Sequence, residues 1–125
     1  MRLRLRWIEG LYGIARLEAD AMIPEWADGP GFVSISRADD ELTVVCLAAR
    51  IPGDVQADRE WVCLRSVGPF AFDESGVVLR LIEPLSLAGL GVFVVCTFDG
   101  EHLLVAANDR ERAENLLRAT GYDFD

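Results

Sequence analysis

Two stretches of the chain repeat one pattern of hydrophobic and polar positions. Residues 32–46 and residues 92–106 each consist of an apolar, β-branched run, a short acidic turn and a second apolar run. A β-branched run, a turn and a second run are typical of a β-hairpin. The recurrence about sixty residues later indicates that a small supersecondary unit has been used twice.

The first half of the chain adds short elements around its hairpin. Residues 1–7 alternate in a way that places Leu3, Leu5 and Trp7 on one face of a strand. Glu9-Gly10 predicts a tight turn into a partner strand at residues 11–17. Residues 24–26 leave room only for a stub of helix between Pro24 and Pro30. Residues 52–54 predict a turn before a polar linker.

The second half of the chain contains a longer series of elements. We expect a strand at 61–67, a loop at 68–76, a helix at 77–88, the second hairpin, a helix opened by Asn108 and Glu111, and a last strand at 122–124. In the first helix, Val78, Leu81, Ile82 and Leu85 are spaced for one buried face, and Pro84 predicts a kink. Gly121 is expected to end the second helix.

This order of elements is that of the ferredoxin-like split βαβ arrangement. We therefore expect an α+β fold of two tandem ferredoxin-like modules, with antiparallel sheets and helices on one face. The first module, residues 1–57, is reduced, and the second, residues 58–125, is complete.

Composition narrows the choice of partners and compartment. The net charge is −9 and the isoelectric point is near 4.5, which weighs against nucleic acid and anionic membranes as partners. No apolar run approaches the roughly 20 residues needed to cross a bilayer. Cys46, Cys63 and Cys96 each lie in an apolar run with no nearby second cysteine, so we expect buried thiols, no metal, no cofactor and a cytoplasmic protein.

Seven segments, which together span nearly the whole chain, carry a resemblance to a known family: residues 12–17, 24–26, 32–42, 61–64, 75–77, 96–98 and 103–105. They resemble the corresponding segments of bacterial ACT-domain proteins of the CASTOR-like family. The resemblance implies two fused ACT modules, a homodimer and binding of a small molecule, typically an amino acid. Eukaryotic relatives are cytosolic arginine sensors. Glu101, before His102, stands where the family commonly carries aspartate, so arginine specificity is not part of the expectation.

The best candidate site is the end of the 68–76 loop. There Ser75, Gly76 and Val77 open a helix whose free amide groups suit an amino-acid carboxylate. The alternative is that Ser75 only caps the helix and Gly76 only eases a turn.

A second group of candidates follows a strand. Phe98 could cover the stem of a ligand while Asp99 or Glu101 meets its amine, with Thr97 beside them. The alternative is an ordinary solvated turn. In the first module, Ser36, Arg37 and Asp39 occupy the matching positions, for which we favour a structural role.

These observations predict a non-enzymatic regulatory protein that binds an amino acid. His102 is the only histidine and stands without a metal-ligand or nucleophile pattern. An enzyme on this fold, such as an acyl phosphate hydrolase, would need an anion-binding arginine in the 68–76 loop, which contains none. The remaining alternative is an oligomerisation or adaptor domain that binds another protein without a small ligand.

Overall fold

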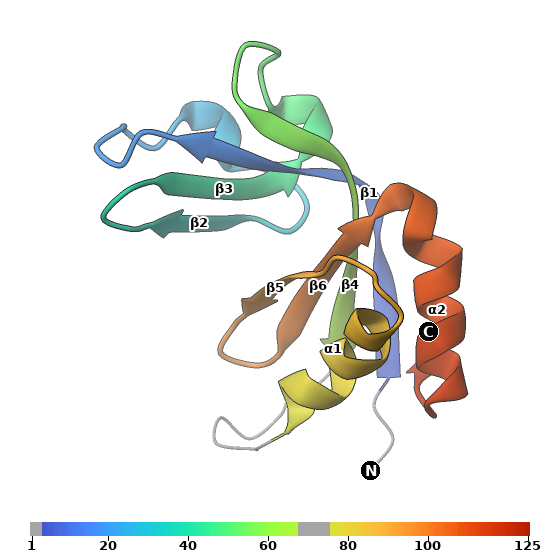
Figure 1. Ribbon diagram of the computed structural model, residues 1–125. Coiled ribbons are helices and arrows are strands. Elements are labelled where there is room, and N and C mark those ends of the chain that lie inside the picture. The colour runs from blue at the N-terminus through green and yellow to red at the C-terminus, as the bar shows by residue number, and fades with distance from the viewer. Residues whose placement is uncertain (1–3, 68–75) are drawn as a thin grey trace. The chain divides into compact units, whose positions relative to one another are not determined.

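A computed structural model describes residues 4–67 and 76–125 (Figure 1). The chain divides into two compact units. The inserted unit is Glu9–Trp61, and the C-terminal unit combines the residues up to Ile8 with those from Val62 onward. Strands β1 (Arg4–Leu17) and β4 (Ala57–Val67) have residues in both units. The predicted boundary after residue 57 falls at the beginning of β4.

The predicted turn at Glu9-Gly10 is wrong, because β1 is one strand of 14 residues that runs through both positions. Gly10 has φ +101°, a backbone conformation that bends or bulges a strand and that glycine adopts without the cost of a Cβ. The dipeptide Glu9-Gly10 is therefore compatible both with a turn and with a continuous strand. The predicted alternation is confirmed over residues 4–7, since Leu5 is buried and Trp7 half-buried while Arg4 and Arg6 are exposed; Leu3 lies outside the described residues.

The inserted unit contains the first repeated hairpin. Strands β2 (Ser34–Arg37) and β3 (Leu42–Leu47) pair antiparallel from Ser34–Val45 to Arg37–Leu42. The turn between them closes with a 2.8 Å hydrogen bond from Ala38 N–H to the Glu41 carbonyl oxygen. On its other side β3 pairs antiparallel with β1. Both the predicted hairpin and its turn are confirmed.

Short 3-10 helices cover the sheet of the inserted unit. The first, η1 (Glu25–Ala27), is the predicted helical stub, and the second, η2 (Ala48–Arg50), follows β3. The buried residues that form the core of this unit are Ala15, Ala27, Val44, Cys46 and Ile51. The predicted turn after residue 51 is present, with Val55 N–H donating to the Pro52 carbonyl oxygen at 3.2 Å.

The C-terminal unit has the predicted order of strands and helices. After β4 come α1 (Val77–Leu87), β5 (Phe93–Cys96), β6 (Glu101–Ala106), the 3-10 helix η3 (Ala107–Asp109), α2 (Arg110–Ala119) and β7 (Asp123–Phe124). Its strands lie in the order β7-β1-β4-β6-β5. The α+β class and the ferredoxin-like arrangement are thus observed.

One strand pair departs from the predicted antiparallel sheet. β7 pairs with β1 in parallel, with Arg4 opposite Asp123 and Leu5 opposite Phe124. Helix α2 connects β6 with β7, so the pairing of β7 with β1 is not a hairpin contact and joins two strands that are far apart in the sequence. The first residues of β1 therefore lie between β4 and β7.

Both helices pack on one face of this sheet. Alternate strand residues, among them Leu5, Leu64 and Leu103, share one buried cluster with Leu81 of α1 and Leu117 of α2. Helix α1 buries Val77, Leu81 and Leu85, while Val78 and Ile82 are half-buried. The predicted helical spacing of the buried face is thus correct, but the face begins at Val77 instead of Val78. The helix runs from Val77 to Leu87 with Pro84 inside it.

The two ends of α2 give opposite outcomes. Asn108 does not cap the helix, because η3 precedes α2 and Asp109 is the N-cap residue, without a side-chain cap hydrogen bond. Gly121 ends the helix as predicted, with φ +103°. Gly121 N–H donates to the Arg118 carbonyl oxygen at 3.0 Å and Tyr122 N–H to that of Leu117 at 3.1 Å, which is the Schellman pattern.

The cysteines are free thiols, and two of the three are buried as predicted. Burial raises the pKa of the Cys63 thiol to about 12. Cys96 is exposed, contrary to the prediction, because it is the last residue of the edge strand β5 and adjoins a turn. Within the described residues, every helix is too short or too polar to span a bilayer.

Candidate functional site

A hydrogen-bonded pair of side chains joins the end of β4 to the start of β6. Ser66 is 1% exposed. Its Oγ accepts a hydrogen bond from Glu101 N–H at 2.9 Å and donates one to Glu101 Oε2 at 2.9 Å. Because Glu101 begins β6, this pair places the turn between β5 and β6 at the end of the sheet where β4 finishes.

That turn carries most of the predicted ligand-binding residues. Thr97 closes it, since both its N–H and its Oγ1 donate to the Gly100 carbonyl oxygen, at 2.8 and 3.1 Å. Phe98 is 77% exposed and Asp99 is also exposed. The structure thus brings an aromatic ring and two carboxylates, those of Asp99 and Glu101, onto one short segment.

Arg65 and His102 add positive and titratable groups to the same end of the sheet. They directly adjoin Ser66 and Glu101 in the sequence, and the Arg65 Nε donates to the Ser66 carbonyl oxygen at 3.3 Å. Burial, and secondarily the charge of Arg65, lowers the pKa of His102 to about 4. His102 is therefore neutral at pH 7.

The beginning of α1 combines a left-handed glycine with an arginine. Gly76 is the N-cap residue, with φ +81°, and its carbonyl oxygen accepts a 3.0 Å hydrogen bond from Arg80 N–H. A Cβ at position 76 would lie 3.1 Å from Arg80 Nη1, so the guanidinium lies over the glycine. A guanidinium beside the amide groups of a helix N-terminus presents two kinds of donor to an anion.

Arg80 also reaches the hydroxyl of Tyr122. Burial raises the pKa of Tyr122, while the charge of Arg80 and its hydrogen bond to the tyrosine act in the opposite direction. The guanidinium therefore connects the first turn of α1 with the residue that precedes β7.

The remaining predicted residues have different outcomes. Ser75, like the rest of residues 68–75, lies outside the described part of the chain. Val77 is 3% exposed and its side chain packs in the core, so only its backbone could contact a ligand. In the inserted unit, Arg37 donates to the carbonyl oxygens of Ala19 and Ala21, which favours the structural role expected for it.

Three residues of this region were not predicted as site residues. Arg80 could have been found from its i+4 spacing to Gly76, since such residues adjoin on a helix. Arg65 and Ser66 gave no local signal, because the partner of Ser66 is 35 positions away.

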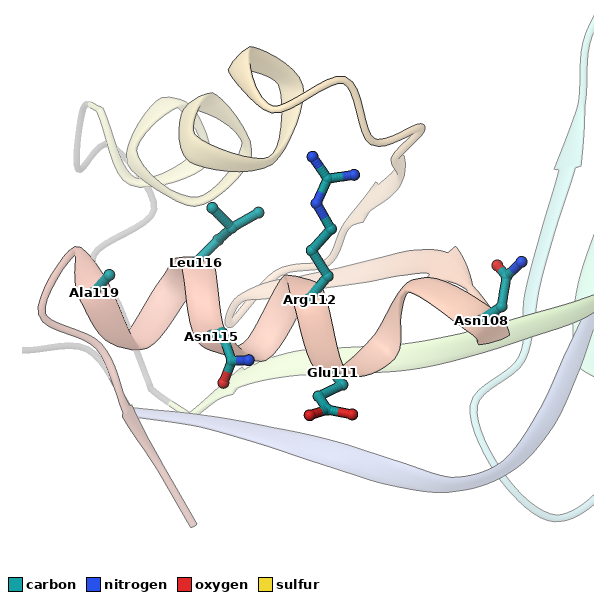
Figure 2. Close-up of a pocket in the computed structure, with 6 residues that line it drawn as sticks. All are labelled: Asn108, Glu111, Arg112, Asn115, Leu116 and Ala119. Carbon is teal, nitrogen blue, oxygen red and sulfur yellow. The ribbon is translucent and has the colours of Figure 1, made fainter.

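An open hollow of about 510 Å³ lies elsewhere, along α2 (Figure 2). It is lined by Asn108, Glu111, Arg112, Asn115, Leu116 and Ala119. Arg112 and Leu116 point toward α1, whereas Glu111 and Asn115 point away from it (Figure 2). The Arg112 guanidinium donates to the Ala88 carbonyl oxygen at 2.8 Å. The hollow contains none of the predicted site residues, and its lining comes only from η3 and α2.

Among the described residues, no three His, Cys, Asp or Glu side chains are grouped so that they could hold a metal ion. The described residues at the end of the sheet present hydrogen-bonding groups, charges and an exposed aromatic ring.

The ferredoxin-like arrangement with two helices on one face of the sheet is that of an ACT-like module. The ACT domain family model matches residues 56–119, about half of the chain, and the chain belongs to this family. A different model, for an N-terminal domain, matches residues 10–54. A second ACT module in the first half, and membership of the CASTOR-like group, stay predictions. No curated protein matches the chain.

Solved structures share the whole fold. A protein of Agobacterium tumefaciens is 56% identical, with a TM-score of 0.95, over 100% of this chain and 93% of that one. The aspartate kinase of Clostridium acetobutylicum, described as an allosteric enzyme, is 10% identical with a TM-score of 0.68 over 90% of this chain. Aspartokinase III of E. coli, in complex with aspartate and ADP, is 12% identical with a TM-score of 0.63 over 95% of this chain. This chain matches 33% of each kinase.

Proposed function

We propose that this protein is a non-enzymatic regulatory protein that binds an amino acid at the end of the sheet where β4 finishes. The fold class supports a regulatory role, since the chain contains an ACT domain and resembles about a third of two aspartate kinases. One of those kinases is described as allosteric, and the other is in complex with aspartate.

The observation that carries the proposal is the position of Arg80 over Gly76. The α-carboxylate of the ligand accepts hydrogen bonds from backbone amides at the start of α1 and from the Arg80 guanidinium. A side chain at position 76 would occupy the space beside Nη1, so the glycine leaves room for the ligand's carboxylate. Charge-assisted hydrogen bonds of this kind are roughly twice as strong as neutral ones.

The ligand's amine and side chain are assigned to the β5–β6 turn. Asp99 is exposed and supplies a carboxylate for the amine, while the exposed ring of Phe98 covers an aliphatic stem. Glu101 is already bonded to Ser66, so its role is to hold the turn in place and to add negative charge. Cys96, Thr97 and Gly100 shape the backbone around this contact.

The regulatory step is differential binding. A ligand that binds one arrangement of the protein more tightly than another shifts the population toward the first by the ratio of the two affinities. A homodimer in the cytoplasm, with the amino acid stabilising one dimer arrangement, completes the proposal. The binding of the ligand at the proposed site would be the event that a partner detects.

The test is thermal unfolding of the purified protein against a panel of the proteinogenic amino acids and common metabolites. A ligand at 100 times its Kd adds roughly 2.7 kcal/mol to the free energy of unfolding, which raises Tm by several degrees for a chain of this length. One or two amino acids should give this shift. The Arg80→Met variant should lose it, and the control Arg112→Met, an arginine of α2, should keep it.

A flat panel at millimolar concentrations would contradict the amino-acid proposal. The adaptor function, in which the domain binds another protein without a small ligand, would then be the better account. A shift of equal size in the wild type and in Arg80→Met would keep the ligand but remove the start of α1 from its site.

A further inference from the structure

The inserted unit exposes an adjacent pair of large apolar side chains between β1 and β2, and a third on the edge strand β2. Met22 is 88% exposed, Ile23 is 55% exposed and Ile35, on β2, is 37% exposed. We call these three residues the Met22 patch. A single exposed apolar side chain is ordinary, but an adjacent pair of large ones that no residue covers is a feature of interaction surfaces.

The backbone that carries Met22 and Ile23 is fastened on both sides. Before the pair, the Arg37 guanidinium donates to the carbonyl oxygens of Ala19 and Ala21. After it, η1 begins, and Ala27 N–H donates to the Pro24 carbonyl oxygen at 3.1 Å. Ala27 is fully buried in the core of the unit. The two side chains are therefore exposed on an anchored segment.

Ile35 is linked to the same segment through Arg37. It lies two residues before Arg37 on β2, and residues two apart in a strand share a face of the sheet. Arg37 holds residues 19 and 21 from that face. The same side of the edge strand thus carries an apolar side chain and the guanidinium that positions Met22.

The unit that carries the patch is strongly acidic. Residues 9–61 contain eleven Asp and Glu against four Arg, a formal charge of −7 out of −9 for the whole chain. Each of the four arginines donates to a backbone carbonyl, the first of them to that of Asp40. Glu18, Asp20, Glu25 and Asp28, which flank the patch in the sequence, are all exposed.

This charge selects the kind of partner. A second copy of the unit, a nucleic acid or an anionic membrane would bring negative charge against negative charge. A basic segment is attracted instead, and the three apolar side chains require apolar side chains on the partner. Methionine adapts its shape to varied apolar surfaces.

We propose that the Met22 patch is a docking surface for a basic, amphipathic segment of another protein. The apolar side chains of that segment would cover Met22, Ile23 and Ile35, and its Lys and Arg side chains would face the carboxylates around them. Burial of apolar area would supply most of the affinity, and the charges would supply the orientation and the rate of association.

The proposal is tested with a labelled peptide of about 16 residues that forms an amphipathic Leu/Lys helix, titrated with the full-length protein and followed by fluorescence anisotropy. A peptide with the same leucines and with Glu in place of Lys is the control ligand. The variant is Met22→Ser with Ile23→Ser, both exposed. The matched control is Leu87→Ser, which removes an 82% exposed apolar side chain of α1 in the other unit.

We expect the wild type to bind the basic peptide. The double variant should bind it at least about tenfold more weakly, which corresponds to about 1.4 kcal/mol. Leu87→Ser should bind it as tightly as the wild type. Equal binding by all three proteins would overturn the proposal, as would equal binding of the acidic peptide or no binding at low salt. Self-association of the wild type that the double variant loses, measured by light scattering, would overturn it in favour of a second copy. Sedimentation with zwitterionic vesicles that the double variant loses would overturn it in favour of a membrane.

Discussion

Ser66 and Glu101 form a reciprocal pair, in which the hydroxyl of one residue accepts from the backbone N–H of the other and donates to its carboxylate, both at 2.9 Å. The serine is almost completely buried, whereas the glutamate is half-buried. One hydroxyl thus satisfies a strand N–H and fixes the direction of a carboxylate at the end of the sheet where the proposed ligand binds.

We expect Ser66→Ala to lower the free energy of unfolding by about 1 to 3 kcal/mol, because it leaves the Glu101 N–H and carboxylate without their partner. The change is measured by urea unfolding. The control is Ser36→Ala, an exposed serine of β2, which should change stability by less than about 0.5 kcal/mol. Similar losses in the two variants would mean that the pair contributes no stability of its own.

Arg50 is expected to hold the connection between β1 and β2 in place. Its Nε donates to the Trp26 carbonyl oxygen at 3.1 Å and its Nη1 to that of Pro30 at 2.6 Å. Because hydrogen bonds from a charged donor contribute about 1.5 to 3 kcal/mol, Arg50→Met should cost about 2 to 3 kcal/mol of stability. It should also increase quenching of Trp26 fluorescence by acrylamide, measured in a background where the other two tryptophans are phenylalanine.

The control for Arg50 is Arg16→Met. Arg16 is exposed and donates to the Asp40 carbonyl oxygen at 3.1 Å, so its loss should cost less than about 1 kcal/mol. If both arginine variants lose the same stability, the hydrogen bonds of Arg50 to residues 26 and 30 contribute no more to the free energy of unfolding than the single bond of Arg16.

His102 should make the free energy of unfolding depend on pH in the acid range. Its pKa of about 4 lies below the ordinary value of 6.5, so between these values the unfolded state binds a proton that the folded state does not. Stability is therefore unaffected by His102 above about pH 6.5, falls as the pH is lowered toward 4, and is not reduced further by this residue below that. His102→Gln should remove this part of the pH dependence.

The measurement is an NMR titration of the His102 ring, which is unambiguous because the chain has one histidine. We expect a midpoint near 4. Arg65→Gln should raise the midpoint only part of the way to 6.5, since burial is the larger cause and Arg65 the smaller. A midpoint near 6.5 in the wild type would show that the ring is hydrated.

These residues also show what the sequence could and could not predict. Hydrophobic periods and glycine stops are local, and so the two repeated hairpins, both helices and the Gly121 stop were predictable. The turn predicted at Gly10 was wrong because a glycine in a turn and a glycine within a strand look the same in the sequence, and only the direction of the following backbone distinguishes them. Ser66, Arg50 and Arg65 act through partners that are distant in the sequence or through backbone atoms, which leave no pattern of their own.

The last prediction concerns Gly76 and uses a matched glycine at the other end of α1. Gly76 and Gly89 have φ +81° and +85°, so either alanine variant pays a similar backbone cost of about 1 kcal/mol. A Cβ at position 76 would meet Arg80 Nη1 at 3.1 Å, whereas nothing lies within 4 Å of one at position 89. Because the backbone strain is common to the two positions, both variants should lose similar stability, measured by urea unfolding.

Only Gly76→Ala should weaken the binding of the amino acid found in the thermal panel, by about tenfold or more, because it displaces the guanidinium and fills the space for the carboxylate. Isothermal titration calorimetry of the two variants separates this effect from the shared loss of stability. Equal affinity in Gly76→Ala and Gly89→Ala would place the carboxylate away from the start of α1. Equal weakening in both would instead assign the effect to the stability of the helix, since the strain is common to the two positions and the contact with Arg80 is not.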